Sequence, residues 1–173
     1  MRKVKIIGVF VIFLLSFASH FMYEWIPNTL FSIIFPVNES IWEHMKLIVT
    51  PVLIFSIFEY IIYRKKNIKF NNFLLSYGVS MIIGIMFYLM IYLPINYIFG
   101  HSMIVAIILL FITFIIVELV SHYIMNYREI RYSNIIGISL IIVIYIVFGY
   151  LTYNPIEINL FYDTEKKIYG IPK

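Results

Sequence analysis

The sequence predicts an all-α membrane protein, a bundle of five transmembrane helices, and three observations indicate this. The chain has 173 residues, of which 62% are hydrophobic and 13% are charged, about half the charge of an average soluble domain. Its mean hydropathy is +0.95. Five apolar runs each approach the roughly 20 residues that a helix needs to cross a bilayer. Because these runs use nearly the whole chain, we expect one transmembrane domain over residues 1–173.

The first predicted helix, residues 4–26, follows a basic start and ends before Pro27. Its beginning also resembles a secretory signal peptide, with Ser16 and Ala18 spaced as at a cleavage site. The apolar run continues past that site to Trp25, which gives it the length of a full membrane span. We therefore expect this segment to be a transmembrane helix.

Four further helices are predicted from apolar runs that polar or proline-containing turns separate. They cover residues 40–63, 72–98, 102–126 and 133–152, and a tail follows over residues 154–173. Pro51 and Pro94 lie inside two of these runs, where each removes a backbone hydrogen bond and favours a kink.

The distribution of lysine and arginine predicts the orientation of the helices. Basic residues cluster in the segments 2–5, 64–69 and 128–131, whereas the loops 27–39 and 94–101 have none. Cytoplasmic loops are enriched in lysine and arginine, so we expect the N-terminus inside and the tail outside the plasma membrane. The net charge of +4 belongs to these flanking clusters, so we expect a lipid bilayer as partner and no nucleic acid.

Several classes of chemistry are excluded by residues that the sequence lacks. There is no cysteine, which removes disulfides, thiolate metal sites and cysteine nucleophiles. The sequence also contains no phosphate-binding loop, nucleophilic serine motif or HExxH zinc motif.

The stretch "PVNESIWEHMKLIVTP" concentrates ionisable residues where the second helix begins, at the predicted outer surface. The expected topology brings histidines and acids of other segments to the same level. His20 and Glu24 are four residues apart and share one helix face. The predicted outer layer thus contains candidate metal ligands His20, Glu24, Glu39, His44 and His101, together with Glu43 and Lys46.

A simpler interpretation explains two of these acids without any site. Ser40 to Glu43 fits a capping box, and Glu39 would be an anion at the positive end of the helix dipole. Trp42 would then be an interfacial anchor. Helix initiation does not require the imidazole of His44, so that residue stays a site candidate.

A second group of ionisable residues is predicted at the inner side. Glu118 and His122 are four residues apart, and we expect them to lie near Glu59. Arg64 and Arg128 are the expected counter-charges, and structural ion pairing is the favoured interpretation. Carboxylates inside a membrane are nevertheless functional candidates by default.

Three functional hypotheses follow from these groups. The leading one is a divalent-metal site for zinc, manganese or iron at the outer layer, where Glu43 would be a general base and Lys46 would stabilise negative charge during hydrolysis of a membrane-associated substrate. The second is a proton- or cation-coupled transporter or transporter subunit. The third is a non-catalytic accessory protein that docks a membrane-protein partner.

The sequence also resembles a family of small bacterial multi-pass membrane proteins known only as a domain of unknown function. The resemblance rests on "PVNESIWEHMKL", "HFMYEW" and "YNPIEINLFYDTEKKIYGI" and covers essentially the whole chain. It implies an NESxWEH motif and no established activity. The tail departs from the family pattern around Asp163 and Lys166, where family members have Asp-Pro and Thr-Gly. The motif residues are Asn38, Glu39, Ser40, Trp42, Glu43 and His44.

Overall fold

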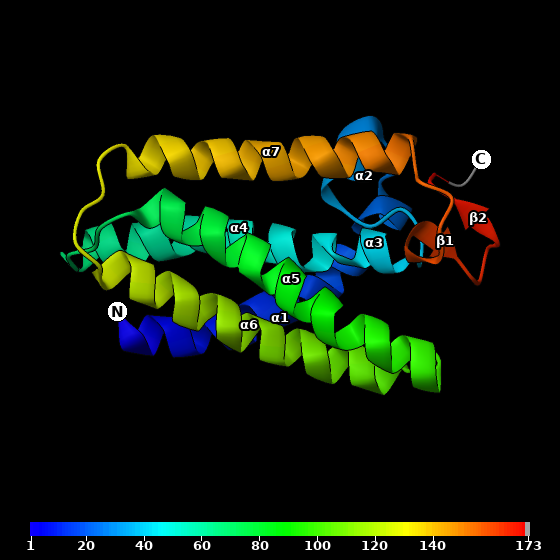
Figure 1. Ribbon diagram of the computed structural model, residues 1–173. Helices are drawn as coiled ribbons and strands as arrows, with labels where there is room; N and C mark the ends of the chain where they lie inside the picture. The colour runs from blue at the N-terminus through cyan, green and yellow to red at the C-terminus, as the bar shows by residue number, and fades with distance from the viewer. Residues whose placement is uncertain (172–173) are drawn as a thin grey trace.

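The structure is a computed structural model, and it describes residues 1–171. Within these residues, five helices are long and apolar enough to cross a membrane, and Figure 1 shows that they run side by side along one axis. The predicted fold class, an all-α bundle of five transmembrane helices, is confirmed. The long helices are α1 (Arg2–Trp25), α4 (Lys46–Lys65), α5 (Phe73–Phe99), α6 (Met103–Asn126) and α7 (Ser133–Tyr153).

The long helices end at residues that stop a helix for local reasons. Helix α1 ends two residues before Pro27, which cannot continue it. Helix α5 ends at Phe99 and is followed by Gly100, whose φ of 78° is one that glycine adopts without strain. Asn72 and Tyr132 precede α5 and α7 in the left-handed region. Pro51 and Pro94 both lie inside helices, α4 and α5.

Short elements gather at one end of the bundle, beside the C-terminal ends of α1 and α7 (Figure 1). The segment expected as one helix over residues 40–63 is divided at Met45 into a one-turn α3 and the long α4. The loop before it contains a further helix, and the tail forms a small antiparallel hairpin. These elements are α2 (Thr29–Ile34), α3 (Ile41–His44), η1 (Asn159–Phe161), β1 (Tyr162–Asp163) and β2 (Ile168–Tyr169).

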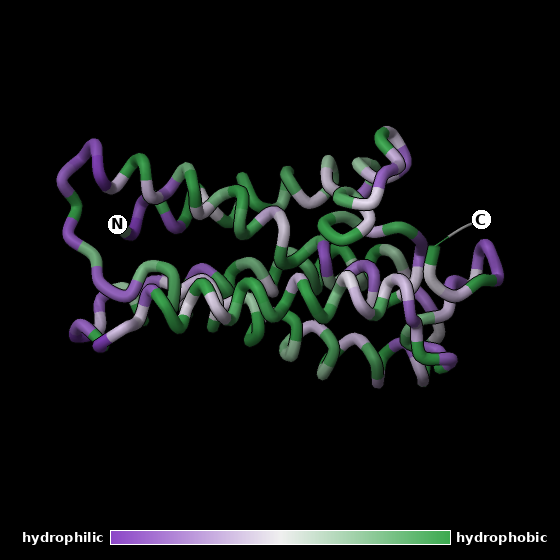
Figure 2. The backbone as a smooth tube through the Cα atoms, turned by 90° about the horizontal axis from the view of Figure 1, so that it is seen from above, coloured by the Kyte–Doolittle hydropathy of each residue, from purple (hydrophilic) through white to green (hydrophobic). Residues whose placement is uncertain are grey.

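The helices pack in two groups that share α6. Helix α5 lies between α6 and α7, while α1 packs against α4 and α6. Gly137 of α7 permits the closest approach, because a Cβ atom there would lie 2.2 Å from the backbone of Leu74 in α5. The outward faces carry many exposed isoleucines, leucines and phenylalanines, as expected for helices in contact with lipid. Figure 2 shows that hydrophilic residues are concentrated at the two ends and hydrophobic residues along the helices between them.

Candidate metal centre

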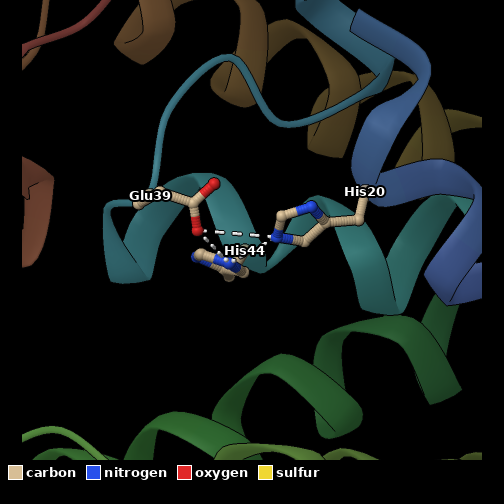
Figure 3. A group of neighbouring side chains, drawn as sticks. All are labelled: His20, Glu39 and His44. Carbon is tan, nitrogen blue, oxygen red and sulfur yellow. Dashed lines mark hydrogen bonds and ion pairs between the residues drawn. The ribbon is translucent and has the colours of Figure 1, made fainter. Parts of the chain in front are cut away.

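Three side chains from separate parts of the chain converge at the end of the bundle that holds the short elements (Figure 3). His20 comes from α1, His44 from α3, and Glu39 from the loop that leads into α3. The Nε2 atoms of the two histidines are 3.3 Å apart. Glu39 Oε2 is 3.5 Å from Nε2 of His20 and 3.3 Å from Nε2 of His44. We call these three residues the His–Glu cluster.

These three distances are long for hydrogen bonds and also fit a bound cation. A hydrogen bond from an imidazole N–H is usually about 2.9 Å long, so separations of 3.3 to 3.5 Å are long. Zinc holds imidazole nitrogen and carboxylate oxygen at about 2.0–2.2 Å in a tetrahedron, whose corners are then about 3.3–3.6 Å apart. The three donor atoms are therefore spaced like three corners of a tetrahedral zinc site.

The tautomer of His44 leaves its cluster-facing nitrogen available as a ligand. Its Nδ1 atom is 2.9 Å from the backbone oxygen of Ser40, and a carbonyl oxygen can only accept a hydrogen bond. Nδ1 therefore carries the proton, and Nε2 of the neutral ring has a free lone pair. Metal-binding histidines are commonly oriented by such a bond from the other ring nitrogen.

With both imidazoles neutral, the hydrogen atoms of the three side chains do not satisfy every close contact in the His–Glu cluster. The Glu39 carboxylate is an acceptor and the neutral His44 Nε2 is another, so only Nε2 of His20 could supply a hydrogen. One hydrogen cannot serve three close contacts. A dication at the centre would satisfy all three donor atoms.

The surroundings of Glu39 favour its ionised carboxylate, which is the form that binds a cation. Hydrogen bonding with His20, and then with His44, lowers the pKa of the Glu39 carboxyl well below its usual range. The group is thus ionised at neutral pH. Its backbone N–H donates to Oδ2 of Asp163 at 3.0 Å. The tail hairpin therefore fixes the position of Glu39 from outside the bundle.

The local fold around α3 comes from the NESIWEH segment itself. Ser40 is the N-cap residue of α3, and its hydroxyl accepts the backbone N–H of Glu43 at 3.3 Å, which is half of the expected capping box. The second bond of a capping box would run from the Ser40 N–H to the Glu43 carboxylate. Here the Ser40 N–H donates to the side-chain oxygen of Asn38, and the Glu43 carboxylate accepts the N–H of Val37 instead. Asn38 also donates to the backbone oxygen of Gly170 at 2.6 Å, which ties the tail to the motif.

Two of the five residues predicted as metal ligands lie outside this cluster. Among the residues that the structure describes, Glu24 is not part of the group that could hold a metal, and its side chain is exposed. His101 is also exposed, and its Nδ1 is 2.7 Å from the hydroxyl of Tyr92. The structure thus brings together His20, Glu39 and His44 of the predicted set.

Glu43 and Lys46, the residues predicted for catalysis, form a buried pair beside the cluster. Lys46 Nζ is 2.6 Å from Glu43 Oε2 and also donates to Thr152 and to two backbone oxygens, those of Ser32 and Phe35. The other carboxylate oxygen of Glu43 accepts from the Thr152 hydroxyl at 2.7 Å. Lys46 and Glu43 therefore join the α2 region, α3 and α7, with protein partners on every charged group.

At the opposite end, Glu59 and Glu118 lie close together, and a residue outside the predicted set joins them. Lys5 Nζ is 2.8 Å from Glu59 Oε2 and 3.0 Å from Glu118 Oε2. His122 is apart from this group, with its ring next to the side chain of Asn126. Sequence reasoning assigned Lys5 only to the basic start of the chain. Its apolar neighbours Val4, Ile6 and Ile7 were the available sign that it could lie within the bundle.

These observations define a class of protein, a five-helix membrane bundle with a His/Glu cluster at one end. The chain belongs to a family of unknown function (DUF6512), whose sequence profile matches residues 1–171. No curated protein and no solved structure matches it.

Proposed function

We propose that this membrane protein binds a divalent transition metal through His20, Glu39 and His44. The observation that supports this most is the mutual spacing of their donor atoms, 3.3 to 3.5 Å, together with the ionised carboxylate and the His44 tautomer. Two imidazole nitrogens and one carboxylate oxygen form a ligand set typical of zinc, and manganese or iron accept the same ligands.

The partial exposure of the cluster leaves a coordination position for a small molecule. The side chains of His20, Glu39 and His44 are 29%, 34% and 26% exposed, so water can reach the centre of the three ligands. Three protein ligands with an open fourth position are typical of catalytic zinc, which lowers the pKa of a bound water to about 7. A metal bound here would be accessible for chemistry as well as for structure.

Hydrolysis of a membrane-associated substrate is the extension of this proposal that the ligand set supports. In it, Glu43 is the general base and Lys46 stabilises negative charge. In the structure, Glu43 and Lys46 form an ion pair with each other, and both are hydrogen-bonded to Thr152. A catalytic role therefore requires them to exchange these partners for water and substrate, and metal binding does not depend on that step.

The cluster faces the outside of the plasma membrane in the orientation that we propose. The N-terminal end of α1 is at the opposite end of the bundle from the short elements (Figure 1), and it carries the basic residues Arg2 and Lys3. The positive-inside rule places that end in the cytoplasm. Because the chain has no cysteine, single cysteines at Lys66 and at Glu157 can be labelled in intact cells. Labelling of the Lys66 variant but not the Glu157 variant would contradict this orientation.

Metal analysis of the detergent-purified protein tests the proposal. After incubation with zinc, manganese or iron and removal of excess metal, the wild type should retain close to one equivalent of one of them. His20→Ala, His44→Ala and Glu39→Gln should each lose it. His101→Ala and His122→Ala are matched controls that should keep it. A wild type that retains no metal, or a cluster variant that retains the wild-type amount, would overturn the proposal.

A further inference from the structure

A second set of ionisable side chains lies inside the bundle, near the end where α1 begins. Lys5 of α1 contacts Glu59 of α4 and Glu118 of α6, and all three side chains are buried. We call these three residues the Lys5 triad. Lys5 and His20 are 15 residues apart on α1, which separates the triad from the His–Glu cluster by about 22 Å along the helix. The two sites are therefore distinct.

Glu59 is surrounded by donors that stabilise its ionised form. Tyr63 donates to Glu59 Oε1 at 2.6 Å, and Tyr77 of α5 and Lys5 both donate to Oε2. Hydrogen bonds to a carboxylate favour the charged state. Glu59 is thus a fixed anion, paired with the ammonium group of Lys5.

Glu118 has a contrasting environment. It is 2% exposed, and within residues 1–171 neither of its carboxylate oxygens has a well-oriented hydrogen-bond donor, although Lys5 and Ser121 lie close by. Its carboxyl group lies against the backbone of α1, since a Cβ added to Gly8 would be 3.4 Å from Glu118 Cδ, and the same Cβ would meet the Phe55 ring. Among the described residues, Lys5 is the cation in contact with it, at 3.0 Å, and Lys5 already pairs with Glu59. An ionised carboxylate in such a place is costly.

The count of charges within the Lys5 triad leaves one negative charge without compensation. Among the described residues, the titratable groups that act on Glu118 include Lys5 of α1, Glu59 and Tyr63 of α4, and Tyr77 of α5. His122 of α6 lies within electrostatic range of Lys5 and Glu59. Two carboxylates and one ammonium sum to minus one. A single additional positive charge would make the triad neutral.

We infer that Glu118 binds a proton and that the Lys5 triad is a proton-exchange site inside the membrane bundle. A proton needs no coordination shell, and it removes the uncompensated charge on the carboxyl group that lacks hydrogen bonds. A metal cation fits poorly, since hard cations require several oxygen ligands and Lys5 Nζ lies 3.0 Å from Glu118 Oε2. The exchange is a simple equilibrium in which the Glu118 carboxylate takes one proton from water and later returns it.

Infrared spectroscopy of the wild-type protein in a maltoside detergent tests this inference independently of any metal. Such detergents contain no carbonyl group, so the C=O stretch of an un-ionised carboxyl group is visible. At pH 7 the wild type should show one such band, which shifts in heavy water. Glu118→Gln should abolish the band. Glu59→Gln should also abolish it, because Lys5 and Glu118 then balance each other.

The controls distinguish a proton bound at Glu118 from a metal cation and from a proton on an exposed acid. Glu129→Gln removes an exposed acid and should leave the band unchanged, and so should replacement of choline chloride by sodium chloride. The absence of a band in the wild type, or its survival in Glu118→Gln or Glu59→Gln, would overturn the inference. Loss of the band on adding sodium would assign the site to a metal cation instead of a proton. If a variant fails to fold, the absence of a band in the wild type would still overturn the inference.

Discussion

Lys46 and Lys5 are both buried ammonium groups in contact with glutamate, but they lie at opposite ends of the bundle and have different charge balances. Lys46 faces one carboxylate, and each of its contacts is a hydrogen bond to a well-placed acceptor. Lys5 faces two carboxylates, and one of them, Glu118, has no well-oriented hydrogen bond within residues 1–171. The comparison indicates that the ratio of carboxylates to ammonium groups distinguishes a structural ion pair from the site that we infer to take up a proton.

The largest expected change in the free energy of unfolding is at the Lys46–Glu43 pair, in which one ammonium group faces one carboxylate. Lys46→Ala leaves the Glu43 carboxylate buried without its cation, and loss of one partner of a buried ion pair costs about 3–5 kcal/mol. Reversible unfolding in mixed micelles, followed by tryptophan fluorescence, should show this loss. Lys3→Ala is the matched control at an exposed lysine and should change the unfolding free energy by less than about 0.5 kcal/mol. Equal stability of the two variants would contradict a structural role for Lys46.

The Lys5 triad should be much less sensitive to the loss of an acid than the Lys46–Glu43 pair. Glu43→Gln removes the charge that compensates Lys46, and we expect it to lower the free energy of unfolding by about 2 kcal/mol or more. Glu118→Gln replaces a carboxyl group that we infer to be neutral by a neutral amide, so its effect should be much smaller. The same unfolding measurement compares the two variants. A larger loss for Glu118→Gln would break the distinction between the two sites.

The His–Glu cluster should lose metal as the pH falls, and the histidines should cause the loss. The lowered pKa of Glu39 keeps that carboxylate ionised, whereas an imidazole that takes up a proton loses the lone pair with which it binds a metal. Two histidine ligands that must be deprotonated predict a decrease in zinc affinity that reaches about 100-fold per pH unit as the solution becomes acidic. Competition with a fluorescent chelator measures this slope. An affinity that is constant down to pH 5 would exclude both histidines as ligands.

The smallest effect is expected from the tail hairpin. Asp163 is fully buried and accepts backbone hydrogen bonds from Glu39, Glu165 and Lys166. Asp163→Asn should weaken these bonds and reduce metal affinity by about 10-fold, the lower end of the effects of residues that support metal ligands. Glu165→Gln, at an exposed position of the same hairpin, should leave the affinity unchanged. Equal affinities would show that the tail does not position Glu39.

The five transmembrane helices were predictable because composition and run length determine where a chain can cross a bilayer. The sequence also predicted that His20 and His44 lie at the same end of the bundle, because one is near the end of the first helix and the other is near the start of the second. Which face of each helix turns inward depends on packing, so the exposure of Glu24 was not predictable. For the same reason Lys5 was interpreted only as a marker of orientation. The contact of Asp163 with Glu39 joins segments 124 residues apart, and no local pattern indicates it.

X-ray absorption spectroscopy at the zinc edge of the loaded protein tests the central claim most directly, because it reports the atoms around the metal. The His–Glu cluster predicts four nitrogen or oxygen neighbours at about 2.0–2.1 Å, with the outer-shell scattering of two imidazole rings. His20→Ala and His44→Ala should each remove one ring or all bound zinc. A shell of six oxygens without imidazole scattering would contradict a metal site at His20, Glu39 and His44.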